Sequence, residues 1–392
     1  MPGARATAGG LVVGLQDALK ESGGIWFGWS GKTSARPSNK PLLTEVAPVT
    51  YATLDLSQYE LDQYYNGYAN RTLWPLFHYR IDLTAFDRQF YPGYQRVNSK
   101  FARVLKPLLK PTDTIWVHDY HLIPLGEELR SAGCKMPIGF FLHIPFPTPQ
   151  VLMTLYNHKR LARHLLHYDV VGFQTPSDVK SFVSIVKELG GEVLRKNVVR
   201  AFGRTVRVGA FPIGIDVDEF HDLAASGPAT THTRRQLSGV GDRKLVIGVD
   251  RLEYSKGLPN RMVASEQLLA NYPENLGRVT MLQIAAPTRE DVPEYVQIRV
   301  ELETAAGHIN GRFGEMDWEP VRYINRSFSR SSLAGLYRAS SVAMVTPLRD
   351  GMNLVAKEYV AAQDAEDPGV LDPVALRRGC GTNDGRDPGQ SV

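Results

Sequence analysis

The sequence has few of the features that mark secreted, membrane or nucleic-acid-binding proteins. Its two cysteines, Cys134 and Cys380, lie far apart and without C-x-x-C spacing, which argues against a disulfide framework or a structural zinc site. Its most apolar run, residues 138–146, is far shorter than the ~18 residues that cross a bilayer, and the first residues lack the apolar core of a signal peptide. A net charge of +4 over 392 residues gives no reason to expect a nucleic-acid-binding surface. We therefore expect a cytoplasmic protein that binds neither nucleic acid nor membrane.

The length and the hydrophobic pattern indicate more than one α/β domain. At about 150 residues per domain, 392 residues suggest two to three domains. Short β-branched or aromatic runs alternate with amphipathic segments from residue 114 onward, which is typical of parallel βαβ units. The predicted strands form two series, at residues 114–118, 138–142, 170–173 and 206–211, and at residues 245–249, 279–284, 322–324 and 342–346. The predicted helices lie at residues 97–109, 151–166, 178–189, 260–271 and 294–306.

The stretch between the two series predicts a domain boundary. The segment PIGIDVDEF (residues 212–220) and then a polar, Gly/Pro/Thr-rich stretch at residues 224–243 separate them, so we expect the chain to cross between lobes near Pro212. The sequence therefore predicts an α/β protein with two Rossmann-like lobes, residues 1–212 and 213–371, with a ligand cleft at the carboxyl ends of the strands.

Both ends of the chain depart from this pattern. The chain opens with a helix-like segment at residues 9–19 and no preceding strand, and the alternation stops at residue 371. Residues 372–392 have many Gly, Asp and Arg and no hydrophobic period, so we expect a disordered tail there. We also expect the first lobe to lack its first strand and the second lobe to be incomplete at its carboxyl end.

The segment GVDRLEYSKGLPNR (residues 248–261) is the most informative one for chemistry. A strand runs into a loop that carries Arg251 and Lys256, and a helix follows. Two cations beside a helix N-terminus form a good receptor for a phosphate or a diphosphate. The alternative is a solvated loop whose cations pair with Asp250 and Glu253. The residues alone leave both interpretations open.

A second strand-to-helix segment, TPLRDGMNLVAKEYVAAQ (residues 346–363), carries Asp350 and Glu358. Backbone N–H groups at residues 351–354 would be donors suited to an anion. The carboxylate of Asp350 or Glu358 could accept hydrogen bonds from sugar hydroxyls. The alternative for Asp350 is that it only caps the helix.

The first lobe has histidines at two strand ends. WVHDYHLIP (residues 116–124) carries His118, Asp119 and His121, and FFLHIPFP (residues 140–147) carries His143. The His-Asp-x-His spacing invites a metal ion, but a metal site needs three or four converging ligands. We favour polar contacts to a neutral polyol. A lone histidine in an apolar run, such as His143, is ordinarily a hydrogen-bonded core residue.

Four further segments suggest parts of a sugar phosphate site. GIWFGWSG (residues 24–31) and YYNGYANRTLWPLFHY (residues 64–79) are rich in Trp and Tyr, whose rings pack either in a core or against the C–H faces of sugars. GGLVVG (residues 9–14) is a weak phosphate-loop signal by itself. Arg289 in APTREDV (residues 286–292) adds a third cation after a strand, which would fit a second phosphate.

Taken in chain order, these segments resemble the trehalose-6-phosphate synthase family, glycosyltransferases with two Rossmann-like lobes (GT-B type). The resemblance extends from residue 9 to residue 371 and rests on GGLVVGL, WFGWSG, YYNGYANRTLWPLFHY, WVHDYHL, GFFLHIPFP, VGFQT, PIGID, DRLEYSKGLP, APTRED and TPLRDGMNLVAKEYVAAQ. Ten ordered motifs are far more specific than any one of them.

The resemblance implies roles for matching residues. The implied donor-binding residues are Gly9, Gly10, His143, Arg251, Lys256, Asp350, Met352, Asn353, Leu354 and Glu358. The implied acceptor-binding residues are Trp29, Tyr65, Trp74, Asp119 and Arg289. Within these sets, the resemblance places Asp119, His143, Arg251, Lys256 and Asp350 at the reacting centre.

The resemblance also implies an activity. The enzyme would join glucose from a nucleoside-diphosphoglucose to glucose 6-phosphate with retention, giving α,α-trehalose 6-phosphate. It would need no metal or other cofactor, its partners would be these small molecules, and it could form a homo-oligomer. The base of the donor, whether uridine, adenosine or guanosine, stays open. The alternative function is a truncated, catalytically impaired remnant that still binds a nucleotide sugar.

Overall fold

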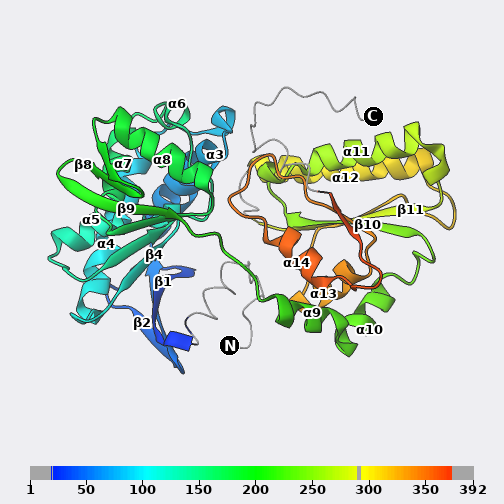
Figure 1. Ribbon diagram of the computed structural model, residues 1–392, viewed down its shortest axis with the longest axis horizontal. Coiled ribbons are helices and arrows are strands. Elements are labelled where there is room, and N and C mark those ends of the chain that lie inside the picture. The colour runs from blue at the N-terminus through cyan, green and yellow to red at the C-terminus, as the bar shows by residue number, and fades with distance from the viewer. Residues whose placement is uncertain (1–18, 20, 289–292, 373–392) are drawn as a thin grey trace. The chain divides into compact units, whose positions relative to one another are not determined.

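The computed structural model describes residue 19, residues 21–288 and residues 293–372, and this part of the chain divides into two compact units (Figure 1). The N-terminal unit extends to Ile213, and the C-terminal unit begins at Gly214. Residues Asp350–Met352 return to the N-terminal unit, although their neighbours on both sides belong to the C-terminal one. Each unit has its own central sheet with helices packed on it, as the two predicted Rossmann-like lobes require.

The N-terminal unit is built on a six-stranded sheet of order β4-β5-β6-β9-β8-β7. Neighbouring pairs from β4 to β9 are parallel, and β7 and β8 add an antiparallel hairpin. The strands are β4 (Ile115–His118), β5 (Ile138–Phe141), β6 (Val170–Phe173), β7 (Glu192–Arg195), β8 (Val198–Ala201) and β9 (Arg204–Ala210). The four strands predicted for this lobe are confirmed, whereas the β7–β8 hairpin was not predicted.

Helices of the N-terminal unit surround this sheet. They are α2 (Gln58–Glu60), the π-helix η1 (Leu61–Leu73), α3 (Trp74–Phe77), α4 (Phe90–Leu105), α5 (Leu125–Ser131), α6 (Pro149–Leu152), α7 (His158–Leu165) and α8 (Pro176–Glu188), with short 3-10 turns η2 (Ile81–Leu83), η3 (Lys106–Leu108) and η4 (Tyr120–Leu122). The single helix predicted at residues 151–166 is wrong, because α6 and α7 are separate. Leu152 and Leu161 are both buried, so the apolar spacing persists across a break in the helix.

A second, three-stranded sheet of order β1-β3-β2 precedes these elements. Its strands are β1 (Gly24–Thr33), β2 (Leu42–Val46) and β3 (Val49–Leu56). The aromatic segment at residues 24–31 is therefore a strand, which its composition alone did not predict. Only β3 in this sheet alternates strongly, with Ala52, Leu54 and Leu56 buried, because the other two strands lie at the sheet's edges.

The C-terminal unit has an all-parallel sheet of order β12-β11-β10-β13-β14, with β10 in the middle. Its strands are β10 (Lys244–Arg251), β11 (Val279–Ala286), β12 (Val321–Ile324), β13 (Val342–Met344) and β14 (Val370–Asp372). Its helices are α9 (Val217–Ala225), α10 (Gly227–Gln236), α11 (Leu258–Asn271), α12 (Pro293–Phe313), α13 (Arg330–Arg338) and α14 (Leu354–Ala362), with 3-10 turns η5 (Tyr254–Lys256) and η6 (Pro273–Asn275). All four strands predicted for this lobe are confirmed.

The polar stretch at residues 224–243, for which no helix was predicted, is mostly helical. Asp216 caps α9 and Ser226 caps α10, each through a side-chain oxygen that accepts from the backbone N–H three residues on. Few residues of α10 are apolar, so its hydrophobic period was too weak to see. The helix is held instead by Ala229, which is buried against Gly335 of α13.

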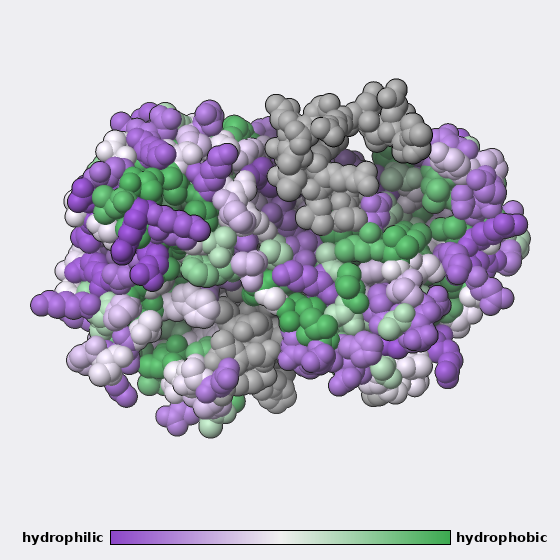
Figure 2. Space-filling view, in the orientation of Figure 1, coloured by the Kyte–Doolittle hydropathy of each residue, from purple (hydrophilic) through white to green (hydrophobic). Residues whose placement is uncertain are grey.

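The surface of the described residues is mixed in character. Figure 2 shows hydrophilic side chains interspersed with small apolar patches on the face in view. Among the described residues, no helix combines the length and apolar character that a bilayer crossing requires.

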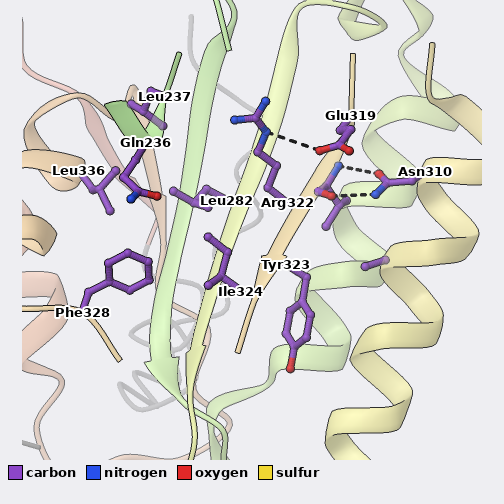
Figure 3. Close-up of a pocket in the computed structure, with 12 residues that line it drawn as sticks. Gln236, Leu237, Leu282, Asn310, Glu319, Arg322, Tyr323, Ile324, Phe328 and Leu336 are labelled. Atoms are coloured by element: carbon purple, nitrogen blue, oxygen red, sulfur yellow. Dashed lines mark hydrogen bonds and ion pairs between the residues drawn. The ribbon is translucent and has the colours of Figure 1, made fainter. Parts of the chain in front are cut away.

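A side chain of α12 forms hydrogen bonds with the outward-facing backbone groups of the edge strand β12. Asn310 donates through Nδ2 to the carbonyl oxygen of Val321 (2.8 Å) and accepts through Oδ1 from the Val321 N–H (2.9 Å), so one amide pairs with both outward-facing groups of that residue (Figure 3). A cavity of about 530 Å³, which Arg322, Tyr323 and Phe328 help to line, adjoins this strand. An edge strand with unpaired groups invites pairing with another chain.

We expect Asn310→Leu to lower the free energy of unfolding by about 1–3 kcal/mol, because Val321 would keep two buried backbone groups without partners. Urea unfolding measures the loss, and light scattering should show more association of the variant through the open edge. Asn271→Leu, at an exposed position of α11, is the matched control. Equal stability of the two variants would show that the hydrogen bonds of Asn310 do not stabilise the edge strand.

Candidate functional site

The loop after β10 carries the two predicted phosphate-binding cations. Arg251 is the last residue of β10, and Lys256 ends the short turn η5 just before α11. Gly257 follows Lys256 and directly precedes α11. Its φ is +64°, and a Cβ at this position would overlap the carbonyl oxygen of Thr346. Glycine is therefore required at this turn, which places Lys256 directly beside the N-terminus of α11.

An ion pair of the expected kind forms within this loop. Arg251 Nη1 lies 2.9 Å from Glu253 Oε1, and the Glu253 side chain is fully buried. The Arg251 side chain nevertheless keeps 51% of its surface exposed, so part of its guanidinium can meet an anion. The pairing with a buried carboxylate holds Arg251 in place and does not exclude phosphate binding.

Asp250 pairs elsewhere, with a residue that the sequence did not single out. Its Oδ2 accepts from Arg261 Nη2 (2.8 Å), and the Arg261 side chain is completely buried. Arg261 also donates to Gln283 Oε1 (2.9 Å) and to Thr346 Oγ1 (3.0 Å). These three acceptors belong to β10, β11 and the segment after β13. One guanidinium thus ties together the carboxyl ends of three neighbouring strands beneath the cationic loop.

The second predicted loop divides its residues between the two units. Asn353, not Asp350, caps α14, since its Oδ1 accepts from the Ala356 N–H (3.1 Å). Asp350 instead accepts from the N–H of Gly351 (3.0 Å). A Cβ at Gly351 would overlap the backbone carbonyl of His143, so this loop packs against the chain that follows β5. The structure thereby brings His143 together with residues Asp350–Met352.

Glu358 lies one turn into α14 and is mostly buried. Burial raises the pKa of its carboxyl to about 7, although Arg330 and a hydrogen bond with Tyr337 oppose the shift. A carboxyl with a pKa near neutral pH can change its protonation state when a ligand binds.

In the N-terminal unit, Asp119 follows β4 in a strained backbone conformation, with φ 73°. Its N–H donates to the carbonyl of Phe141 (2.8 Å), and its Oδ1 accepts from the backbone N–H of His143 (3.2 Å). The ends of β4 and β5 are therefore joined at this residue. A non-glycine residue with positive φ is held by its surroundings and is frequent at functional sites.

His118 and His143 form a hydrogen-bonded pair, with His118 Nδ1 3.0 Å from His143 Nε2. Burial lowers the pKa of His118 to about 4 and that of His143 to about 3, and in His143 the neighbouring His118 adds to the effect. Both rings are therefore neutral at physiological pH. Among the described residues, no group of three or more His, Cys, Asp or Glu side chains is arranged to hold a metal ion.

The predicted aromatic acceptor residues belong to one chain of ring contacts. The ring centroids of Trp29 and Tyr65 are 5.2 Å apart. Tyr65 stacks on His121, with ring centroids 5.3 Å apart and an interplanar angle of 13°. His121 contacts Tyr120 (3.9 Å), which contacts Trp74 (5.6 Å). Trp29 comes from β1, Tyr65 from η1 and Trp74 from α3, so three elements converge beside Asp119.

Some site predictions fall outside what the structure describes, and some contacts were missed. Gly9, Gly10 and Arg289 lie outside the described residues. We did not predict the ring contacts of Tyr120 and His121, which lie in the motif WVHDYHL. We also did not predict the hydrogen bonds of Gln174, which lies in the motif VGFQT. Their proximity depends on long-range contacts that spacing does not reveal.

Comparison with known proteins gives one consistent match. A model of glycosyltransferase family 20 matches residues 4–372. The chain is 50% identical over 372 residues to the trehalose-6-phosphate synthase of Sinorhizobium fredii, covering 94% of this chain and 80% of that protein. It is 46% identical over 368 residues to the trehalose-6-phosphate synthase of Escherichia coli strain K12 / DH10B, covering 93% of this chain and 77% of that protein.

Solved structures agree with the sequence matches. The α,α-trehalose-phosphate synthase (UDP-forming) of Burkholderia vietnamiensis has a TM-score of 0.91 at 50% identity, over 94% of this chain and 79% of that one. The Burkholderia xenovorans enzyme in complex with glucose-6-phosphate has a TM-score of 0.90 at 51% identity, over 93% and 82%. An E. coli structure described as bound with UDP-2-fluoro glucose has a TM-score of 0.89 at 45% identity, over 94% and 82%.

Proposed function

The chain belongs to glycosyltransferase family 20, and from that membership we propose that it transfers glucose from UDP-glucose to glucose 6-phosphate, forming α,α-trehalose 6-phosphate with retention and releasing UDP. The observation that carries the proposal is identity of about one half over 94% of the chain with a trehalose-6-phosphate synthase. The neighbours that bind glucose-6-phosphate and UDP-2-fluoro glucose support the choice of acceptor and of uridine as the donor base.

We propose that the C-terminal unit binds the donor. Arg251 and Lys256 contact the diphosphate, and the N-terminus of α14, capped by Asn353, offers further N–H donors. Met352 and Leu354 flank Asn353 and contribute backbone contacts. Glu358, one turn along the same helix, accepts hydrogen bonds from the ribose hydroxyls.

We propose that residues of the N-terminal unit bind the acceptor. Trp29, Tyr65 and Trp74 supply aromatic rings of the kind that pack against the C–H groups of a sugar, although Trp74 is 4% exposed in this structure. Asp119 is fixed between β4 and β5 and accepts from an acceptor hydroxyl. His143, held beside Asp350 and Gly351, contacts the donor glucose.

The chemistry follows from charge development. Breaking the bond between glucose and UDP leaves negative charge on the diphosphate, which the guanidinium of Arg251 and the ammonium of Lys256 stabilise in place. A phosphate oxygen of the departing group accepts the proton of the acceptor hydroxyl on the same face of the sugar. This route uses no carboxylate nucleophile, metal ion or other cofactor.

The proposal is tested by UDP release from UDP-glucose by the purified chain, with and without glucose 6-phosphate, and with ADP-glucose as an alternative donor. We expect release that depends on glucose 6-phosphate, and a product whose two anomeric carbons are both α by NMR. Donor binding without acceptor-dependent release would contradict the proposed transfer and favour a nucleotide-sugar-binding protein.

Glu358 predicts that donor affinity depends on pH. Ribose hydroxyls donate to the ionised carboxylate, so only that form binds the donor well, and with a pKa of about 7 it is in the minority below neutral pH. We expect the dissociation constant of UDP-glucose to rise about tenfold between pH 8 and pH 6, in proportion to the lost ionised fraction. Isothermal titration calorimetry at constant ionic strength measures this change.

Glu358→Gln is the control for that assignment. It should bind UDP-glucose more weakly than wild type at pH 8 but with an affinity that no longer changes between pH 8 and pH 6. A pH dependence that survives in this variant would assign the titration to another group.

A further inference from the structure

Gln174, in the VGFQT motif, links three parts of the N-terminal unit. It follows β6 directly and is 2% exposed. Its Oε1 accepts from the backbone N–H of Ile213 (2.9 Å), and its Nε2 lies 3.4 Å from Nδ1 of His143. Ile213 is the last residue before the chain passes into the C-terminal unit.

The orientation of this amide is determined by its partners. A backbone N–H can only donate, so the atom of Gln174 that faces Ile213 is the oxygen, and the NH₂ group must face His143. An amide NH₂ can only donate, so Nδ1 of His143 accepts and carries no proton. His143 is thereby restricted to the tautomer with its proton on Nε2.

The next contact completes the sequence of donors and acceptors. Nε2–H of His143 donates to Nδ1 of His118 (3.0 Å), and His118 then carries its own proton on Nε2. Protonation of His143 at Nδ1 would set an N–H against the NH₂ of Gln174. The low pKa values that burial gives to both rings agree with this arrangement.

We propose that Gln174 is a positioning residue for the glucosyl transfer, holding His143 as a neutral ring with its proton on Nε2. The inference rests on the proposed function, in which His143 contacts the donor glucose. Positive charge develops on the glucose ring as its bond to the leaving group breaks. An imidazolium beside that ring would oppose the charge, whereas a neutral ring that is anchored through Gln174 to the backbone of Ile213 does not.

Other ionisable groups also face His143. Asp119, at the end of β4, accepts from its backbone N–H, and His118, in β4, meets its ring. Asp350 lies next to Gly351, which packs against the His143 carbonyl. Both carboxylates lie near the His143 backbone, while burial and the uncharged donor at Nδ1 keep its ring neutral.

The test has a spectroscopic and a kinetic arm, both on the full chain. Two-bond ¹H–¹⁵N spectra of histidine-labelled wild type, with His143 assigned by its loss in His143→Phe, should show the proton on Nε2 from pH 5.5 to 8. Gln174→Glu replaces the donor at Nδ1 by an acceptor. It should place a proton on Nδ1 and raise the pKa of His143 into the range of about 5 to 7.

In the kinetic arm, kcat of Gln174→Glu at saturating substrates should be about tenfold below wild type at pH 8. It should fall further on an acidic limb that wild type lacks. Gln363→Glu is the matched control, because Gln363 also accepts from a backbone N–H, that of Gly369 (2.8 Å), and donates to two carbonyls. It should keep the wild-type pH profile even if it unfolds at lower temperature.

Two results would overturn the proposal. One is a wild-type His143 with its proton on Nδ1, which requires no variant to fold and no activity. The other is a Gln174→Glu protein with the wild-type tautomer and pH profile. Absence of transferase activity in wild type would contradict the proposed function, while the spectra would still report the tautomer.

Discussion

Lys256→Ala is expected to lower kcat/KM for UDP-glucose about 100-fold. Lys256 ends η5 beside the N-terminus of α11 and is 8% exposed, so its ammonium is held near the loop and not free in solvent. A charge-assisted contact to the diphosphate contributes ~1.5–3 kcal/mol. The loss is larger in the transition state than in the ground state, because negative charge on the leaving diphosphate grows as the glycosidic bond breaks.

Initial rates over a range of UDP-glucose concentrations measure this effect, with calorimetry for ground-state affinity. Lys244→Ala is the matched control, since Lys244 is exposed at the opposite end of the same strand, β10. It should retain wild-type kcat/KM. Wild-type donor affinity and rate in Lys256→Ala would remove Lys256 from the diphosphate site.

The central strands of the two larger sheets were predictable because they are buried along most of their length. In β10 and β11, for example, runs such as Leu245–Val249 are mostly apolar and are bounded by polar residues. The small sheet of β1, β2 and β3 was not predicted, because Trp26, Phe27 and Trp29 are only partly buried and lack strict alternation. The helix α10 was missed for the corresponding reason, since packing and a cap hold it rather than an apolar face.

The site was predictable where it depends on chain position and hidden where it depends on tertiary contacts. Arg251, Lys256 and Glu358 stand on loops or helices after parallel strands, where ligands of such folds bind. Arg261, by contrast, lies within α11. The hydrophobic spacing of that segment predicts a helix but does not reveal that Arg261 is buried at the strand ends. The contact of Gln174 with His143 and Ile213 joins positions 31 and 39 residues away, which no local pattern reports.

Arg261→Met is expected to lower the free energy of unfolding by about 3–5 kcal/mol. The guanidinium is fully buried and binds Asp250, Gln283 and Thr346. Methionine nearly fills the space but removes the guanidinium that binds the Asp250 carboxylate, whose side chain is 5% exposed. The cost arises from weaker compensation of that buried charge and not from lost volume.

Asp250→Asn combined with Arg261→Met separates charge from packing. If loss of the guanidinium from the buried carboxylate is the cause, the double variant should regain about half of the lost stability in urea unfolding at pH 7, because an amide is less costly to bury than a charge. Arg312→Met controls for loss of an arginine, since Arg312 pairs with Glu266 at 2.6 Å but is 51% exposed, and it should lose at most about 1 kcal/mol. Thr346, which Arg261 binds, also packs against Gly257, the residue after Lys256. Arg261→Met should therefore also weaken UDP-glucose binding in the folded protein. Equal losses of stability in Arg261→Met and Arg312→Met would contradict the stabilising role of the buried guanidinium.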